Sequence, residues 1–241
     1  LYRRLGPRRA VLAELAVLGA AALGALTLVY QVHSFGNDDV TTGTFDARLH
    51  WLPANFHLFV PGMALAVVAG FFSYVFRMQM AFPGMYVPGW GIVTPNEYNM
   101  LVTNHGAIMI FWVAMPVLIA AFGNYLIPLM IGADDMVFPK INRLSYQIFL
   151  ASVVILVASF FFQGGGFGGA WTVYPPLSAK PEYNLTAIGS TLFLLAIALE
   201  FIAFLLGGIN FITTTMNSRA PGMGYHDIPI VVWFIVIASI L

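Results

Sequence analysis

The sequence contains no cysteine and very little charge, since only 8% of its 241 residues are Asp, Glu, Lys or Arg. Without cysteine the chain cannot form a disulfide, a thiolate metal site, an iron–sulfur cluster or a covalent c-type haem attachment. Acidic and basic residues balance at ten each, and basic residues form a run only within the first nine positions. Nucleic-acid binding is therefore not expected.

What the chain has instead is hydrophobic sequence: 60% of the residues are hydrophobic and the mean hydropathy is +0.85. Uncharged stretches of about 20 residues recur, and each is long enough to cross the hydrocarbon core of a bilayer as a helix. We therefore predict an all-α, polytopic membrane helical bundle with about five to six transmembrane helices. Residues 1–241 are interpreted as one transmembrane domain without a soluble part.

The expected spans follow from where the uncharged stretches begin and end. They cover residues 15–35, 58–76, 100–130, 144–162, 185–216 and 228–241. The first follows four arginines and is interpreted as a retained extra N-terminal helix rather than a cleaved signal. The last has only 14 residues, so we expect it to be the truncated beginning of a span.

His105 is the leading candidate for a cofactor ligand, because it is the only ionisable group apart from Tyr125 in the span 100–130. A neutral imidazole in an apolar helix can bind haem iron through one nitrogen while its other N–H is held by an acceptor. A histidine hydrogen-bonded between helices explains the same residue equally well. The remaining four histidines lie at span ends or in loops, where a solvated ring needs no explanation.

Asp135 and three asparagines form a second group of candidates. At about 1.5 Å per residue, Asp135 lies about 45 Å along a helix from His105, near the opposite membrane face. A surface carboxylate with Asn124, Asn142 and Asn210 nearby could order water and conduct protons. The alternative is that Asp135 caps a loop and the asparagines join helices.

Glu200 is placed near the centre of its span, where an ionised carboxylate costs several kcal/mol and is normally protonated or paired. Arg77 is the one evident basic counterpart near a span. Glu200 is therefore either a proton relay or a protonated, structural side chain. A transporter with an intramembrane site formed by Glu200 and Arg77 is an alternative function.

Four segments resemble one family closely and in one order along the chain. They are YNMLVTNHGAIMIFWVAM (98–115), FGNYLIPLMIGADDMVFPKIN (122–142), WTVYPPLS (171–178) and GGINFITTTMNSRAPGM (207–223). These segments resemble subunit I of cytochrome c oxidases and related haem–copper terminal oxidases. The resemblance covers roughly residues 55–241, which are interpreted as a partial oxidase core.

The resemblance implies a role for several residues near a low-spin haem of a or b type. His105 matches one axial ligand of its iron, and the other ligand comes from a helix beyond this chain. Arg77 matches an arginine near a haem substituent, Tyr98 a tyrosine seven residues before the histidine, and Trp171 a tryptophan near the propionates. The ligands of the high-spin haem and of copper are expected outside this chain, so no complete catalytic site is expected in it.

The same resemblance assigns Asp135 to the mouth of the family's D-type proton pathway, with Asn124, Asn142 and Asn210 lining the entrance. The sequence departs from the family further along this route, where Ala203 and Phe204 stand in place of serines. Our hypothesis is that Glu200, one turn away, substitutes for the missing hydroxyls.

The electron donor divides the family. Quinol-oxidising relatives place an Arg and an Asp where this chain has Val68 and Phe72, and a His and a Gln where it has Glu97 and Met100. Cytochrome c is therefore the expected donor, and a quinol-oxidising member of the family is the alternative.

The resemblance implies an integral membrane protein of the bacterial cell inner membrane that reduces dioxygen and pumps protons. Its expected partners are the remainder of subunit I, subunit II with the electron entry site, subunit III and membrane lipid. A fragment that binds haem without catalysis is a further alternative for this chain taken alone.

Overall fold

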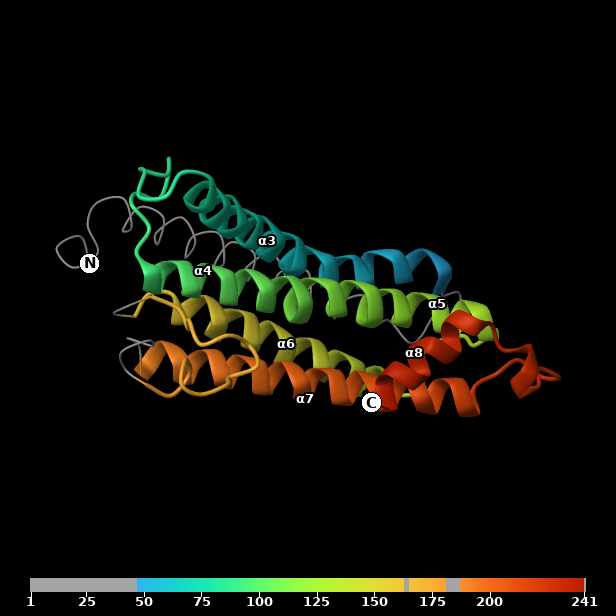
Figure 1. Cartoon of the computed structure of the whole chain (residues 1–241). Coiled ribbons are helices and arrows are strands. Elements are labelled where there is room, and N and C mark those ends of the chain that lie inside the picture. The colour runs from blue at the N-terminus through green and yellow to red at the C-terminus, as the bar shows by residue number, and fades with distance from the viewer. Residues whose placement is uncertain (1–46, 163–164, 181–186, 241) are drawn as a thin grey trace.

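The computed structural model describes residues 47–162, 165–180 and 187–240, and it describes side chains from residue 62 onward within these ranges except at residue 187. The expected helix at residues 15–35 lies outside this part. The described elements are all helical (Figure 1). They are α3 (Ala47–Ala81), α4 (Pro95–Ala107), η1 (Ile108–Ala114), η2 (Pro116–Ala121), α5 (Phe122–Ile131), α6 (Pro139–Ser159), α7 (Ala187–Asn217), η3 (Tyr225–Asp227) and α8 (Ile230–Ile240).

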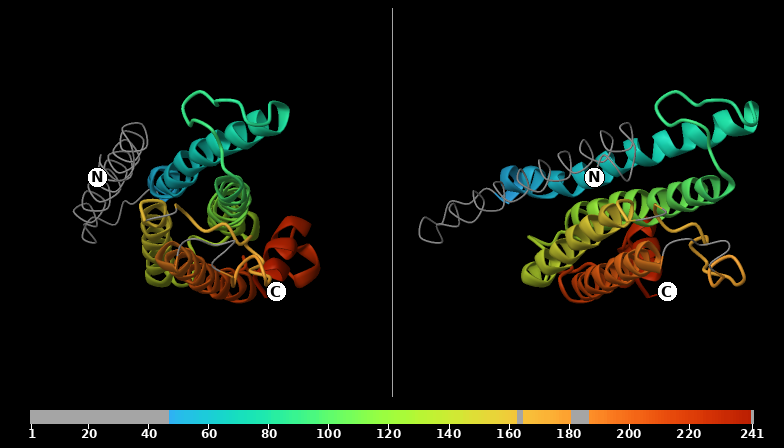
Figure 2. Two further views of the ribbon diagram at one scale, coloured as in Figure 1. Left: turned by 60° about the vertical axis from the view of Figure 1, so that its left-hand side comes forward. Right: turned by 90° about the vertical axis from the view of Figure 1, so that its left-hand side faces the viewer.

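Within the described residues, four helices are long and apolar enough to cross a membrane: Gly62–Ala81, Pro95–Ile131, Pro139–Ser159 and Ile188–Asn217. The apolar α8 is shorter, with 11 residues. The prediction of an all-helical membrane protein is therefore confirmed. The long helices run side by side, and α3 leans away from α4 toward the loop that joins them (Figure 2).

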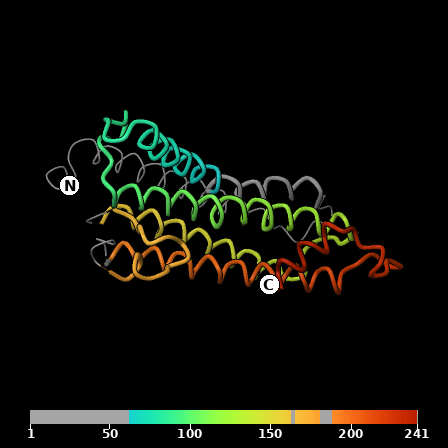
Figure 3. The backbone as a smooth tube through the Cα atoms, in the orientation of Figure 1, coloured from blue at the N-terminus to red at the C-terminus, as the bar shows by residue number. Residues whose placement is uncertain are grey.

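The loops gather at the two ends of the bundle (Figure 3). Residues 82–94 and 165–180 lie at one end, while the α5–α6 and α7–α8 connections lie at the other. Together α4, η1, η2 and α5 form one long helix, Pro95–Ile131. His105 is close to its start at the first end, and Asp135 lies four residues beyond its last residue at the second end. His105 and Asp135 thus lie toward opposite ends of the long helix, with Asp135 in the connection after it rather than within it.

The long helix begins and ends at residues suited to those positions. At its start the Glu97 backbone N–H donates to Thr94 Oγ1 at 3.3 Å, and the Thr94 backbone N–H donates to Glu97 Oε2 at 2.9 Å. This reciprocal pair is a capping box, and Pro95 occupies the first turn, where its missing N–H costs nothing. At the other end Gly132 has a φ of 70°, a left-handed conformation that glycine adopts without a steric penalty.

The middle of this helix is widened into two π-helical stretches, η1 and η2. The N–H of Met115 donates to Ile110 O, five residues back. Pro116 follows, and a proline inside a helix lacks an N–H and crowds the carbonyl four residues earlier, here that of Trp112. The widening relieves this conflict. At the same level a Cβ on Gly62 would lie 3.3 Å from the Trp112 carbonyl oxygen, so α3 approaches the widened segment closely.

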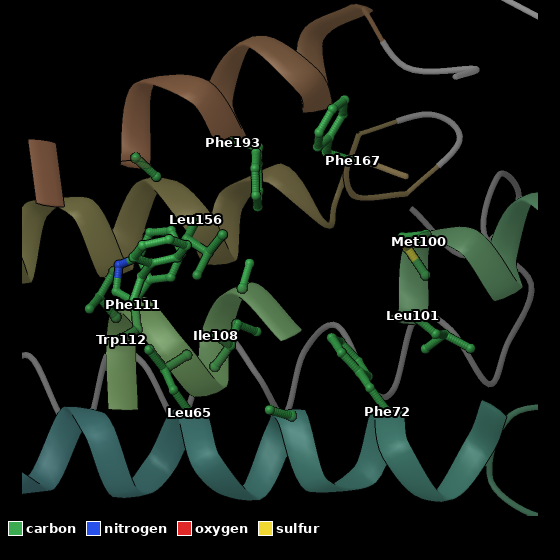
Figure 4. Close-up of a cluster of buried hydrophobic side chains, with 14 of the residues drawn as sticks. Leu65, Phe72, Met100, Leu101, Ile108, Phe111, Trp112, Leu156, Phe167 and Phe193 are labelled. Carbon is green, nitrogen blue, oxygen red and sulfur yellow. The ribbon is translucent and has the colours of Figure 1, made fainter. Parts of the chain in front are cut away.

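One apolar core joins α3, the long helix, α6, α7 and the glycine-rich loop, whose described residues are 165–180 (Figure 4). Trp112, Phe167 and Phe193 are among its largest fully buried side chains. The rings of Phe167 and Phe193 lie 4.9 Å apart, which fixes the glycine-rich loop on α7. A second cluster joins α5, α7 and α8 around Phe211 and Val232.

The connection between the expected spans 100–130 and 144–162 is shorter in the structure, because α6 already begins at Pro139. Lys140 and Arg143 therefore belong to its first turns rather than to a loop. Proline is favoured in the first turn of a helix, and this explains the earlier start.

Candidate functional site

His105 is half-buried on α4, and the neighbouring helix α3 fixes its ring. Its Nδ1 lies 2.9 Å from the backbone oxygen of Ala69. A carbonyl oxygen only accepts hydrogen bonds, so Nδ1 carries the hydrogen and donates it. The lone pair of Nε2 is consequently left for a Lewis acid such as haem iron, and this is the arrangement typical of a ligating histidine.

Aromatic rings surround this histidine. The Phe76 ring packs edge-on against His105 with centroids 5.5 Å apart and edge-on against Tyr98 with centroids 6.2 Å apart. The structure thus brings Tyr98 and His105 together through Phe76. Arg77 follows Phe76 on α3 and is exposed. These residues provide one nitrogen ligand in apolar, aromatic surroundings, so they fit one axial side of a haem.

Trp171 comes to the long helix from the glycine-rich loop. Its ring packs edge-on against Phe111 of η1 at 5.4 Å and is 46% exposed, so one face is open to a ligand or a partner. Ala170 and Val173, which flank Trp171 and Thr172, have φ values of 60° and 55°. Such left-handed values are uncommon for residues with a Cβ, especially β-branched valine.

Three residues of α4 hold this loop, and only Met100 among them was considered from the sequence, as a position that differs in quinol-oxidising relatives. The Gly166 N–H donates to Met100 Sδ at 3.2 Å, and the Ala170 N–H donates to Thr103 Oγ1 at 3.1 Å. The fully buried Asn104 donates to Phe167 O at 2.9 Å. Asn104 directly precedes His105, and an amide inside an apolar helix was the one feature that could have indicated its role.

Asp135 is exposed in the connection between α5 and α6, where its Oδ1 accepts from the Met136 N–H at 2.6 Å. Asn210, fully buried on α7, holds this connection in place. Its Oδ1 accepts from the Phe138 N–H at 3.0 Å, and its amide donates to Phe138 O at 3.3 Å. Thr214 Oγ1 accepts from the Val137 N–H at 3.1 Å. Asn210 therefore joins helix and loop, as in one of the two interpretations made from the sequence.

The two other asparagines behave differently. Asn124 is buried and donates to Ala120 O at 2.7 Å, while its Oδ1 is buried and has no hydrogen-bond partner. A buried acceptor without a partner is costly and marks a place where water can be bound. Asn142 is half-buried near the start of α6, and its backbone N–H donates to Phe138 O at 3.0 Å.

Glu200 is fully buried on α7. Its Oε2 lies 3.1 Å from Ser152 Oγ of α6, and Ser152 Oγ lies 2.9 Å from Trp112 Nε1. Arg77 is exposed on α3, and no ion pair joins it to Glu200 in the described part of the chain. The two residues are not brought into a common site, as a transporter with a Glu200–Arg77 site would require.

No group of three or more His, Cys, Asp or Glu residues that could hold a metal ion occurs among the residues the structure describes. A haem needs no such group, because the macrocycle supplies four nitrogens and the protein adds only an axial side chain.

A family model described as "Cytochrome C and Quinol oxidase polypeptide I" matches residues 54–241. The chain belongs to this family of haem–copper oxidase core subunits. The match begins close to residue 55, where the resemblance was expected to begin. The family is one of oxidoreductases that bind haems and copper.

Two curated relatives agree with this assignment. The chain is 39% identical over 181 residues to the "Alternative cytochrome c oxidase subunit 1" of Bradyrhizobium diazoefficiens, covering 74% of this chain and 29% of that protein. It is 41% identical over 181 residues to the "Cytochrome c oxidase subunit 1" of Candida albicans, covering 75% of this chain and 33% of that protein. The chain thus spans about a third of the length of the curated relatives it matches.

Proposed function

We propose that this chain is part of the core subunit of a respiratory terminal oxidase. In this proposal electrons from cytochrome c pass through a low-spin haem to a haem–copper site, which reduces dioxygen to water with proton uptake and pumping. His105 is one axial ligand of the low-spin haem. The observation that carries the proposal is its Nδ1–H donated to Ala69 O, which leaves Nε2 for iron.

The haem, when bound, supplies one-electron transfer at its iron. This chain's residues bind and orient it. Ala69 fixes the tautomer of His105, while Phe76 packs against the rings of both His105 and Tyr98. Trp171 is proposed to lie near the propionates and Arg77 near another substituent, and the exposure of both side chains leaves them accessible to such groups.

Cytochrome c is the proposed donor. The four positions where quinol-oxidising relatives carry polar residues serve packing or capping in this chain. Phe72 is buried and Val68 packs against the core. Glu97 completes the helix cap, and Met100 accepts a hydrogen bond from the glycine-rich loop. A quinol head group would find no equivalent polar contacts there, since specificity rests on particular site residues rather than on the fold.

Asp135 is the proposed point of proton entry, with Asn124, Asn142 and Asn210 at the entrance and Glu200 further along. This assignment of Asp135 is supported by its exposure in the α5–α6 connection, which lies at the end of the bundle opposite the loop that carries Trp171. Asn210 contributes by holding the Asp135 loop, and Asn124 by offering a buried acceptor.

The proposed partners are the remainder of subunit I, subunits II and III, and lipid, in a bacterial inner membrane. The second haem and copper are bound in the remainder of the subunit in this proposal. The proposed organisation is one transmembrane helical domain over residues 1–241, in which residues 55–241 form the partial oxidase core.

The deciding experiment is a reduced-minus-oxidised absorption spectrum of the detergent-purified complex containing this chain, compared with its His105→Leu variant. We expect a low-spin haem band that the variant lacks, and its position identifies the haem type. Tyr125→Phe is a matched control in the same helix, because this half-buried ring lies 20 residues away from His105. An unchanged band in His105→Leu would overturn the proposal.

A further inference from the structure

A buried polar cluster lies in the middle of the bundle, where η1, α6 and α7 meet. Trp112, Ser152 and Glu200 are each 0% exposed. Ser152 Oγ is the centre of the cluster. It lies 2.9 Å from Trp112 Nε1, 3.1 Å from Glu200 Oε2 and 2.7 Å from the backbone oxygen of Phe149.

The number of hydrogens available to Ser152 restricts the state of Glu200. A serine hydroxyl donates one hydrogen and accepts at two lone pairs. Trp112 Nε1 is only a donor and Phe149 O is only an acceptor. If the Ser152 hydrogen points to Phe149 O, the contact with Glu200 is a hydrogen bond only when the Glu200 carboxyl donates.

An ionised Glu200 fits the same contacts less well. It would require the Ser152 hydrogen, and the 2.7 Å contact between Ser152 Oγ and Phe149 O would then hold no hydrogen. Its second oxygen, Oε1, is buried without a hydrogen-bond partner. An unpaired carboxylate oxygen in an apolar interior is far costlier than the carbonyl oxygen of a neutral acid.

We propose that Trp112, Ser152 and Glu200 form a proton-holding site in which Glu200 is a neutral carboxylic acid that donates its hydrogen bond to Ser152. With the acid protonated, each of the three contacts of Ser152 Oγ contains one hydrogen. Trp112 donates to Ser152, Ser152 donates to Phe149 O, and Glu200 Oε2 donates to the second lone pair of Ser152.

The position of Glu200 connects this site with the Asp135 loop. Glu200, Ala203, Gly207 and Asn210 follow one another at helical spacing on one buried face of α7. Asn210 holds the loop, and Glu200 lies ten residues further along, about 15 Å at the usual rise. On this face of α7 the side chains between them are the methyl group of Ala203 and the hydrogen of Gly207, and a Cβ on Gly207 would meet nothing within 4 Å.

Use of the site in turnover rests on the proposed function. A proton released from Glu200 Oε2 passes to water of the route and leaves a carboxylate. The Ser152 hydroxyl then turns from Phe149 O to that carboxylate, and reprotonation from water turns it back. Trp112 continues to donate to Ser152 in both states, so a single hydroxyl rotation accompanies the transfer.

The test is infrared absorption of the purified complex in the carboxylic-acid C=O region, above the amide I band. We expect the wild-type protein to show an acid band that is absent from Glu200→Gln. Ser152→Ala should move this band to higher frequency, because the acid loses its hydrogen-bond acceptor. Ser159→Ala is the matched control, since Ser159 is also fully buried on α6 and bonded to a carbonyl three residues back. It should leave the band in place.

If Glu200→Gln keeps every carboxylic-acid band of the wild type, Glu200 is ionised and the proposal is overturned. A band that Ser152→Ala does not move would overturn the hydrogen-bond arrangement. Spectra of the oxidised and reduced complex test exchange of the proton: a band that changes amplitude supports it, and an invariant band overturns it. The visible haem band of the same sample reports on the proposed function separately, because the acid band needs no haem.

Discussion

The imidazole of His105 on α4 is hydrogen-bonded to the backbone of Ala69 on α3, with 2.9 Å between Nδ1 and the carbonyl oxygen. The orientation of the candidate ligand therefore depends on how closely two helices approach. Ala69 is 0% exposed at this contact. Because its side chain is only a methyl group, Ala69 lets the backbone of α3 come close enough for its carbonyl oxygen to reach the ring. A longer side chain at this position would hold the two helices further apart.

The first prediction follows from this contact. Ala69→Leu should push α3 away from α4, at a cost of about 1–3 kcal/mol for overpacking. We expect the low-spin haem band to broaden or shift in absorption spectra of the purified complex. Gly70→Ala is the control, because its Cβ would meet nothing within 4 Å. An unchanged band in Ala69→Leu would show that the carbonyl of Ala69 does not orient the ligand.

The sequence was sufficient to predict the helices that cross the membrane, because long apolar runs leave few alternatives in lipid. It was also sufficient to single out His105, Asp135 and Glu200 as rare ionisable groups in or near those runs. Their assignment to a haem and to a proton route stays a prediction. The helix ends were less accurate: Pro139 begins α6 earlier than the polar residues after it indicate.

Relations between helices could not be predicted from one sequence. Ser152 and Trp112 are ordinary residues of apolar helices until the fold brings them to Glu200. Likewise, Asn210 pairs with Phe138, which lies 72 residues away in the chain. The π-helical widening before Pro116 also depends on packing, since proline alone is equally compatible with a kink.

The second prediction concerns Gly123 of α5. A Cβ at this position would lie 2.9 Å from the Phe211 ring of α7, so Gly123→Ala forces the two helices apart. We expect a loss of about 1–3 kcal/mol in stability, the usual range for an overpacked core. Thermal inactivation of the detergent-purified complex measures it. Gly70→Ala again provides a glycine-to-alanine control with open space, and equal stability of the two variants would contradict the close packing of α5 and α7.

The third prediction concerns Asn210. Asn210→Leu removes both hydrogen bonds to Phe138 and leaves its N–H and carbonyl groups without these partners, at about 1–3 kcal/mol for each buried group. We expect faster hydrogen–deuterium exchange in residues 136–138, read by mass spectrometry. Thr213→Val is the matched control, because Thr213 on the same helix bonds only to its own helix at Ile209 O. Unchanged exchange would mean that the loop is held by other contacts.

The fourth prediction separates the two carboxylates of the proposed proton route. Asp135→Asn and Glu200→Gln each remove one protonatable group while nearly preserving shape, and neither residue contacts His105 in the described contacts. Both variants should therefore keep the low-spin haem band but pump fewer protons per electron when the intact enzyme is reconstituted in vesicles.

Their hydrogen bonding distinguishes the two effects. Asp135 is exposed at the surface, so Asp135→Asn should slow proton uptake from the bulk and leave the acid C=O infrared band intact. Glu200 is buried with Ser152, so Glu200→Gln should abolish that band and leave the Asp135 loop unchanged in hydrogen exchange. Unchanged pumping in Glu200→Gln would refute a role for Glu200 in place of the missing hydroxyls. Unchanged pumping in Asp135→Asn would remove Asp135 as the point of entry and would leave the exposed Asp134 and Asp227 as the carboxylates described at this end of the bundle.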